Sequence, residues 1–257
     1  MKRGLEGLAR FNPIGRAARL AEAEKARVLQ ASLLPQSIPQ IEGFAIACAW
    51  QPSSEVSGDY YDVFPLNGDQ MALCVADVSG KGMSAAALTR ELREAVRASA
   101  PEAGSPAELC TQVNKSLCSR IAPGKYAAMF YGVIDRRTGR LQYENAGHCL
   151  PLLVRAGGAV EFPASFSGVL GLFSHWLYNN QEIQLGAGDK LLLVTDGIIE
   201  AEGRRGEEFG YQRLISLVNS GGAQGPERLS RDILDAVSKF CNQKMCDDAS
   251  LIVVAAE

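Results

Sequence analysis

The sequence has few of the residues that zinc sites and covalent nucleophilic enzymes require. It contains only two histidines, His148 and His175, and its seven cysteines form no C-x-x-C pair. That supply is too small for a zinc site without other ligands. An odd number of cysteines, most of them inside apolar or helical segments, predicts reduced thiols and not a disulfide framework. No Ser/His/Asp or Cys/His constellation is visible either.

Long apolar runs and an excess of positive charge are also missing. No stretch approaches the ~18 apolar residues of a membrane span, and the polar N-terminus has no signal-peptide core. The net charge of −3 argues against a general nucleic-acid-binding surface. We therefore expect a cytoplasmic protein with no membrane segment and no nucleic-acid partner. With 257 residues and 47% hydrophobic composition, the chain can bury one large core.

The N-terminal part of the chain differs in composition from the rest. Residues 1–15 show no clear period and are predicted to be a disordered tail or truncation scar. Residues 16–38 are predicted to hold a linker or regulatory helix, since 16–34 lack Gly and Pro and are rich in Ala, Glu, Arg and Leu. The helix carries a weak heptad-like spacing. It is therefore either a weak coiled coil or a helix that lies along the domain. Residues 39–257 are predicted to form the main domain.

The remaining chain arranges strands and helices in blocks. Helices are predicted after Gly82, from Pro106 with Ser105 in a capping box, at 211–219 and at 226–240. Strands are predicted at 44–50, 60–65, 71–78, 127–135, 141–145, 151–155, 160–162, 181–185, 190–195 and 250–255. Residues 181–185 and 190–195 are expected to pair with each other around a Gly-rich turn. Runs of strands followed by helix pairs predict an α+β fold of antiparallel sheets covered by helices.

Acidic residues gather where the predicted strands end. Asp77 and Asp196 each close a short apolar run, and two further acidic groups lie beside other strands, at 57–62 (SGDYYD) and 246–248 (CDD). Carboxylates packed together repel one another unless a cation neutralises them. The pattern therefore predicts a hard-cation site with oxygen ligands, of the kind that Mg²⁺ and Mn²⁺ prefer.

These acids could also serve different roles. Aspartate is common in turns, so each one alone is as easily a turn residue. Residues 79–82 (SGKG) resemble a P-loop only superficially, because the G-x-x-x-x-G-K-[ST] spacing is absent. An aspartyl-phosphate mechanism would use Asp77 or Asp196 as nucleophile, but neither has a second Asp two positions on. A pair of divalent ions that activates water and clamps phosphoryl oxygens accounts for the whole set without a protein nucleophile.

Six short motifs follow one another along the chain. They are SLLP (32–35), SGDYYD (57–62), VADVSGKG (75–82), NAGH (145–148), TDGIIEA (195–201) and DDAS (247–250). Taken in this order, they resemble the motifs of the PPM phosphatases, the metal-dependent serine/threonine phosphatases related to protein phosphatase type 2C. The closest likeness is to the bacterial SpoIIE/RsbU subfamily, and the resemblance covers about residues 28–257.

The resemblance implies a four-layer α-β-β-α sandwich of two antiparallel sheets flanked by helices. It also implies a centre of two Mn²⁺ or Mg²⁺ ions at one end of the sheets. Asp59 and Asp77 match the N-terminal metal ligands, together with the carbonyl oxygen of Val78. Asp196 and Asp247 match the C-terminal ligands. The four aspartates would take part in catalysis through a metal-bound water.

Some nearby residues receive no firm role from the resemblance. Asp62 and Asp248 are adjacent acids with weaker claims to a metal. His148 invites a general-acid role, but a structural role at a strand turn is favoured because it lies in no acidic cluster. No counterpart of the phosphate-binding arginine of the eukaryotic relatives is visible, so phosphate binding would rest on the metals. The NAGH motif continues with Cys149 where the subfamily usually has Asn/His-Pro-Pro, which puts only loop geometry in doubt.

Members of this subfamily usually act on phosphoserine or phosphothreonine of small anti-sigma-factor antagonists with a STAS domain, in partner-switching control. The resemblance implies such a phosphoprotein as the substrate. It also implies an upstream sensor domain or regulator acting on the N-terminal helix, and a homodimer is a further expectation. Two alternatives remain, a catalytically silent scaffold that binds a phosphoprotein and a two-metal phosphohydrolase of small phosphate esters. Retention of all four matched aspartates favours the active protein phosphatase.

Overall fold

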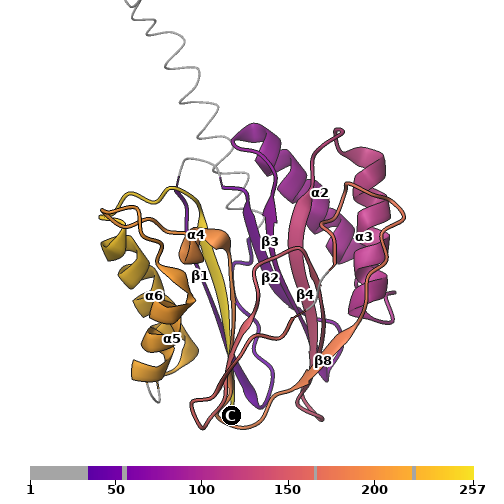
Figure 1. Ribbon diagram of the computed structural model, residues 1–257. Coiled ribbons are helices and arrows are strands. Elements are labelled where there is room, and N and C mark those ends of the chain that lie inside the picture. The colour runs from indigo at the N-terminus through magenta and orange to yellow at the C-terminus, as the bar shows by residue number, and fades with distance from the viewer. Residues whose placement is uncertain (1–33, 54–56, 165–166, 222–223) are drawn as a thin grey trace, which may run out of the picture.

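Two five-stranded antiparallel sheets lie face to face, and helices cover their outer faces (Figure 1). The computed structural model describes residues 34–53, 57–164, 167–221 and 224–257. The predicted tail at 1–15 and all but the last residue of the predicted helix at 16–34 lie outside these ranges. The four layers agree with the expected α-β-β-α sandwich of the α+β class.

The first sheet is built mainly from consecutive hairpins. Asn67 and Gly68 form the first turn, where the Leu66 N–H donates to the Gln70 carbonyl at 3.0 Å. Gly139, at φ 68°, closes the next tight turn, since a residue with a Cβ is strained in that conformation. In spatial order the strands are β2 (Asp59–Pro65), β3 (Gln70–Val78), β4 (Ala127–Asp135), β5 (Arg140–Ala146) and β8 (Gln181–Gln184).

The second sheet combines the two ends of the described chain. Its first strand pairs with its last along their whole length, from Phe44 opposite Ala256 to Gln51 opposite Ala249. In spatial order the strands are β1 (Phe44–Gln51), β10 (Ala249–Ala256), β9 (Lys190–Val194), β6 (Leu152–Val154) and β7 (Val160–Glu161). The strands predicted at 151–155 and 160–162 pair with each other as the β6–β7 hairpin.

The hairpin predicted between residues 181–185 and 190–195 is wrong. β8 pairs with β5 in the first sheet, whereas β9 pairs with β10 and β6 in the second. The connection between them carries the chain from one sheet to the other. In this connection, the carboxylate of Asp189 accepts hydrogen bonds from the backbone N–H groups of Gly186 and Ala156, both at 3.0 Å. The same carboxylate forms an ion pair with Arg155 at 2.8 Å. These contacts tie the turn to the β6–β7 hairpin instead of closing it on β8.

Each sheet is covered on its outer face by a pair of helices (Figure 1). The first sheet carries α2 (Met83–Ser99) and α3 (Pro106–Arg120), and the second carries α5 (Gly210–Ser220) and α6 (Pro226–Phe240). The predicted cap of α3 is confirmed, since the Ser105 hydroxyl accepts a hydrogen bond from the Glu108 N–H at 3.2 Å. The sequence pattern did not predict the one-turn helix α4 (Asp196–Ile199).

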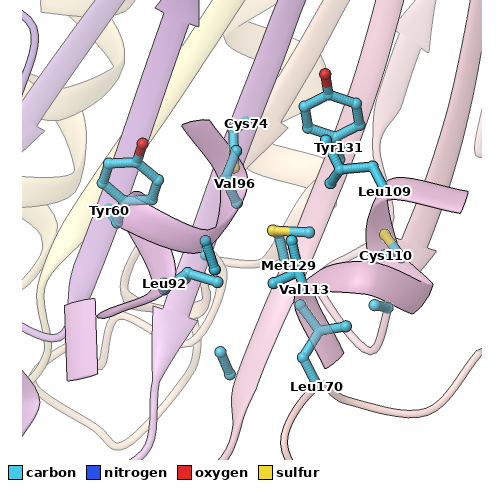
Figure 2. Close-up of a cluster of buried hydrophobic side chains, with 14 of the residues drawn as sticks. Tyr60, Cys74, Leu92, Val96, Leu109, Cys110, Val113, Met129, Tyr131 and Leu170 are labelled. Atoms are coloured by element: carbon cyan, nitrogen blue, oxygen red, sulfur yellow. The ribbon is translucent and has the colours of Figure 1, made fainter. Parts of the chain in front are cut away.

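Three apolar layers hold the sandwich together because alternate residues of each strand face opposite sides. Figure 2 shows the layer under α2 and α3, where Leu92, Val96 and Val113 meet Met129 and Tyr131 of the first sheet. A second layer lies between the sheets and a third lies beneath α5 and α6. No helix of the described residues is long and apolar enough to cross a membrane.

An ion pair between a buried carboxylate and a partly exposed arginine fixes α2 against the first sheet. The Asp62 carboxylate is almost completely buried and accepts two hydrogen bonds from Arg97, both at 2.7 Å, and one from the Tyr60 hydroxyl at 2.7 Å. The Arg97 guanidinium also stacks over the ring of Phe64 at 3.9 Å from the centroid. Asp62 is therefore a structural residue of the α2–β2 contact.

Replacing Arg97 by Gln should destabilise the domain by about 3 kcal/mol, because a buried carboxylate then loses its counter-charge. The double variant Asp62→Asn/Arg97→Gln should recover most of that loss, since a neutral amide costs less to bury. Urea unfolding of both variants measures the difference. Equal stability of the single and double variants would show that the charge pair has no such role.

Candidate active site

Asp59 and Asp77 lie side by side at one end of the first sheet. They are direct partners in the β2–β3 register, at the start of β2 and near the end of β3. A Cβ placed on the neighbouring Gly58 would stand 2.9 Å from an Asp77 carboxylate oxygen and 3.1 Å from the carbonyl oxygen of Val78. Only glycine fits here, and it lets two predicted ligand oxygens approach the same point.

Asp196 and Asp247 lie at the corresponding end of the second sheet. Asp196 begins α4 immediately after β9, and Asp247 lies two residues before β10. A Cβ on Gly197 would overlap the carbonyl oxygen of Asp248, so the start of α4 packs directly on the backbone at 247–248. This close approach brings the two acidic turns of the second sheet together.

Buried hydrogen bonds join the acidic ends of the two sheets. The Asp248 carboxylate accepts from the backbone N–H groups of Gly58 at 2.9 Å and Ser53 at 2.7 Å, and from the Ser53 hydroxyl at 3.0 Å. The Thr195 hydroxyl donates to the Asp59 carboxylate at 2.8 Å and accepts from the Ser250 N–H at 2.9 Å. Asp248 therefore connects the sheets, with both carboxylate oxygens occupied by protein donors.

The aspartates of this end are close enough to perturb one another. Burial, followed by the charges of Asp196 and Asp247, raises the pKa of Asp77 to about 7. Burial and Asp247 likewise raise the pKa of Asp196. The pKa of Asp59 is raised by burial, and hydrogen bonds from Ser250 and Thr195 oppose the shift. The cluster therefore carries more negative charge than the surrounding protein neutralises.

A polar pocket of about 300 Å³ opens beside the cluster. Asp77, Asp247, Lys81 and Tyr126 are among the residues that line it. Lys125 lies at the same place, with its ammonium group donating to the Ser79 carbonyl at 3.4 Å. A smaller pocket of about 190 Å³, between Asp196 and Glu200, adjoins it across Asp247. The acids thus border a solvent-accessible space that also contains a positive charge.

Comparison with known proteins identifies the family. Residues 67–257 match the family model of stage II sporulation protein E, SpoIIE. That match covers well over half of the chain and includes three of the four candidate ligand aspartates. The chain belongs to the SpoIIE family. Its sequence motifs and its two-sheet sandwich are those of a PP2C-type phosphatase domain.

Two curated relatives share the sequence over most of the chain. Protein IcfG of Synechocystis sp. is 27% identical over 91% of this chain and 41% of its own length. The phosphoserine phosphatase RsbU of Bacillus subtilis is 28% identical over 91% of this chain and 70% of its own length. The SpoIIE-family chain therefore spans less than half of the length of protein IcfG.

A solved structure confirms the fold. The SiaA-PP2C domain of Pseudomonas aeruginosa superposes with a TM-score of 0.84 at 20% identity, covering 96% of this chain and all of that domain. Phosphatases of this fold are metal-dependent.

The candidate ligands of this SpoIIE-family domain are all oxygen atoms, which hard cations prefer. Four carboxylates and the Val78 carbonyl supply oxygen ligands only, and the raised pKa of Asp77 shows charge that a cation would neutralise. Among the residues that the structure describes, no three His, Cys, Asp or Glu side chains already stand together as a coordination group.

His148 lies apart from the acids. Its backbone N–H donates to the Asn145 side chain at 2.7 Å, and its ring Nδ1 lies 3.4 Å from the Cys149 carbonyl. Burial lowers the pKa of His148 to about 4, and none of the candidate ligand aspartates contributes to that shift. These contacts agree with a neutral, structural histidine at the turn after β5.

Sequence reasoning missed two supporting residues, Thr195 and Ser53. Thr195 bridges Asp59 of one sheet to β10 of the other through its hydroxyl, and Ser53 donates to Asp248. The available signal was the threonine directly before Asp196, where a hydroxyl typically caps the next helix. In the structure this hydroxyl makes no cap and binds the carboxylate of Asp59 instead.

The raised pKa of Asp77 predicts a pH-dependent stability of the metal-free protein. A carboxyl whose pKa rises on folding stabilises the fold below pH ~4, and this contribution is lost as the pH rises through about 7. In EDTA, Asp77→Asn should therefore be more stable than the parent at pH 8. The difference in free energy of unfolding between the variant and the parent should be roughly 2–3 kcal/mol smaller at pH 5 than at pH 8. Urea unfolding at both pH values measures this, and an advantage independent of pH would contradict it.

Gly197→Ala should disrupt the acidic end without unfolding the molecule. The new methyl group overlaps the Asp248 backbone, so α4 and the turn before β10 must separate. We expect a loss of about 2 kcal/mol in stability, measured by urea unfolding. Gly157→Ala is a matched control, because Gly157 has open space where its Cβ would lie.

Proposed function

We propose that this domain is a metal-dependent phosphatase that hydrolyses phosphoserine or phosphothreonine on a partner protein. The observation that carries the proposal is the set of mutually repelling aspartates beside an open polar pocket, at the end of a PP2C-type sandwich. Phosphoryl transfer to water needs charge neutralisation and positioning more than a protein nucleophile. The donor set offers two Mn²⁺ or Mg²⁺ ions suitable ligands.

Divalent ions, when bound, would lower the pKa of a coordinated water and neutralise the phosphoryl oxygens. Asp59, Asp77, Asp196 and Asp247, with the Val78 carbonyl, would hold them. Thr195 fixes the carboxylate of Asp59 from behind through its hydroxyl. Asp248 holds Gly58 and Ser53, so it keeps the two halves of the centre in register. In the pocket, Lys81 supplies the positive charge on which a phosphate group can dock in place of the missing arginine.

The proposed substrate is a serine-phosphorylated STAS-domain protein of the anti-sigma-factor antagonist class, in a partner-switching system. The likeness to RsbU, whose name describes it as a phosphoserine phosphatase, supports this class. We place the reaction in the cytoplasm, because all seven cysteines are free thiols, as a reducing compartment maintains them. A sensor or regulator acting on the segment at 16–34, or a second copy of the chain, is the proposed source of control.

The decisive test is phosphate release from a phosphoserine STAS-domain protein in Mn²⁺, for the parent chain and for Asp77→Asn. We expect release by the parent, its abolition by EDTA, and at least a 100-fold lower rate in the variant, because a charged ligand is lost. Asp235→Asn on the exposed surface of α6 is the matched control, with the same change of charge and an expected rate equal to the parent.

The same assay separates the two alternative functions from this one. Release from p-nitrophenyl phosphate but not from the phosphoprotein would indicate a phosphohydrolase of small esters. Binding of the phosphoprotein without release from either compound would indicate a silent scaffold. Equal rates for the parent and Asp77→Asn would reject the proposed centre.

A further inference from the structure

A loop between β7 and β8 exposes large apolar side chains to solvent. Within residues 167–180, four such side chains point outward although polar residues would be expected on a solvated loop. They are Leu172 (39% exposed), Phe173 (62%), Trp176 (41%) and Leu177 (81%). We call these four residues the apolar loop surface. Contiguous exposed apolar groups on a soluble domain mark interaction sites.

The loop backbone is held by buried polar side chains. The Asn114 side chain on α3 accepts from the Gly171 N–H at 2.7 Å and donates to the Phe173 carbonyl at 2.9 Å. At the other end, the Glu144 carboxylate accepts from the Asn179 N–H at 3.1 Å. Both side chains are almost completely buried. The protein thus uses two buried polar groups to fix the conformation of a surface loop.

Apolar anchors fix the same loop from inside. Leu170 pairs with Ala127 through two backbone hydrogen bonds of 2.8 and 2.9 Å, and its side chain enters the layer under α3 (Figure 2). Tyr178 is buried in the same layer. Trp176 packs its ring against Gly168, where a Cβ would lie 2.6 Å from a ring atom. The apolar loop surface is therefore presented in a fixed shape, which lowers the entropy cost of binding a partner.

The loop that carries the apolar loop surface is anchored beside the polar pocket. Tyr126, 39% exposed, lines that pocket, and the next residue, Ala127, pairs with Leu170. Gly171, which follows, lies against the Lys125 carbonyl, with 3.4 Å between that oxygen and the position of a Cβ. Tyr126 at the pocket is thus linked to Leu172, the first exposed residue of the loop, through the pairing of Ala127 with Leu170. A macromolecule whose phosphorylated side chain enters the pocket would reach this surface, whereas a small ester would not.

We propose that the apolar loop surface docks the folded body of the phosphoprotein substrate, through an apolar patch beside its phosphoserine. This assignment rests on the proposed phosphatase function. It adds the surface by which the domain would select its phosphoprotein substrate. The pocket recognises a small polar group that many phosphoproteins share, so discrimination must come from contacts away from the phosphate. Lys81, which lines the pocket, and Lys125, which lies beside Ser79 and Gly171, favour a partner with acidic groups around that patch. A second copy of this chain is the competing occupant.

The test compares three substrates in Mn²⁺ with the double variant Phe173→Ser/Leu177→Ser. The substrates are a phosphoserine STAS-domain protein, the short phosphopeptide excised around its phosphoserine, and p-nitrophenyl phosphate. We expect KM for the folded protein to rise about tenfold or more, because exposed aromatic and aliphatic anchors dominate such contacts. The values of kcat/KM for the peptide and the small ester should stay within about twofold of the parent, since the pocket is untouched.

Phe162→Ser is the matched control, because Phe162 is also 39% exposed but packs against Tyr211 of the other helical layer. It should leave all three substrates unaffected. An equal KM for the folded protein in the parent and the double variant would overturn the docking surface alone. Failure of the parent to release phosphate from the folded protein would overturn the proposed function, and this surface with it. A dimeric parent that becomes monomeric in the double variant, with an unchanged KM, would assign the surface to a second copy.

Discussion

The hydrogen bonds between Asp248 and the backbone of Gly58 and Ser53 hold the two sheets in register at their acidic end. The candidate ligands come from separate sheets, Asp59 and Asp77 from one and Asp196 and Asp247 from the other. Moving one sheet relative to the other would separate these two pairs of carboxylates. The buried carboxylate of Asp248 therefore holds together a centre whose candidate ligands come from both sheets. The Thr195 hydroxyl, bound to Asp59, adds a second link of the same kind.

The acidic end also carries a local energetic cost. Burial and mutual repulsion raise the pKa of Asp77 towards neutrality, so the metal-free domain holds charge in an unfavourable place. The rest of the sandwich offsets that cost through three apolar layers and ion pairs such as Asp62–Arg97. Functional sites commonly retain such unfavourable local features. A bound cation would relieve the repulsion between the carboxylates, and this relief would stabilise the folded domain.

Much of the fold and most of the candidate site follow from the sequence. β4 and α6 begin and end where the apolar periods predict, and the strands that end in Asp77 and Asp196 stand out because long apolar runs stop at an acid. The failures have physical causes. Residues 181–185 and 190–195 have the spacing of a hairpin, but each pairs with strands distant in sequence, and Asp189 contacts Ala156 and Arg155 on the side of the second sheet. Likewise, Asp59 and Asp62 share one sequence motif, and the contact with Arg97, 35 residues from Asp62, identifies Asp62 as a structural acid.

The pairing of β1 with β10 has a consequence for the order of folding. Among the described strands β1 lies at a sheet edge, and its neighbour there is β10, some 200 residues later in the chain. During synthesis β1 has no strand partner until β10, some 200 residues later, has emerged. Long-range closure of this kind slows folding and leaves an apolar strand open to wrong partners. A chain cut just before Asp247 would leave β1 without its strand partner, and would also lack the acidic turn that joins the sheets. Completion of the sheet and completion of the candidate centre are thus a single event.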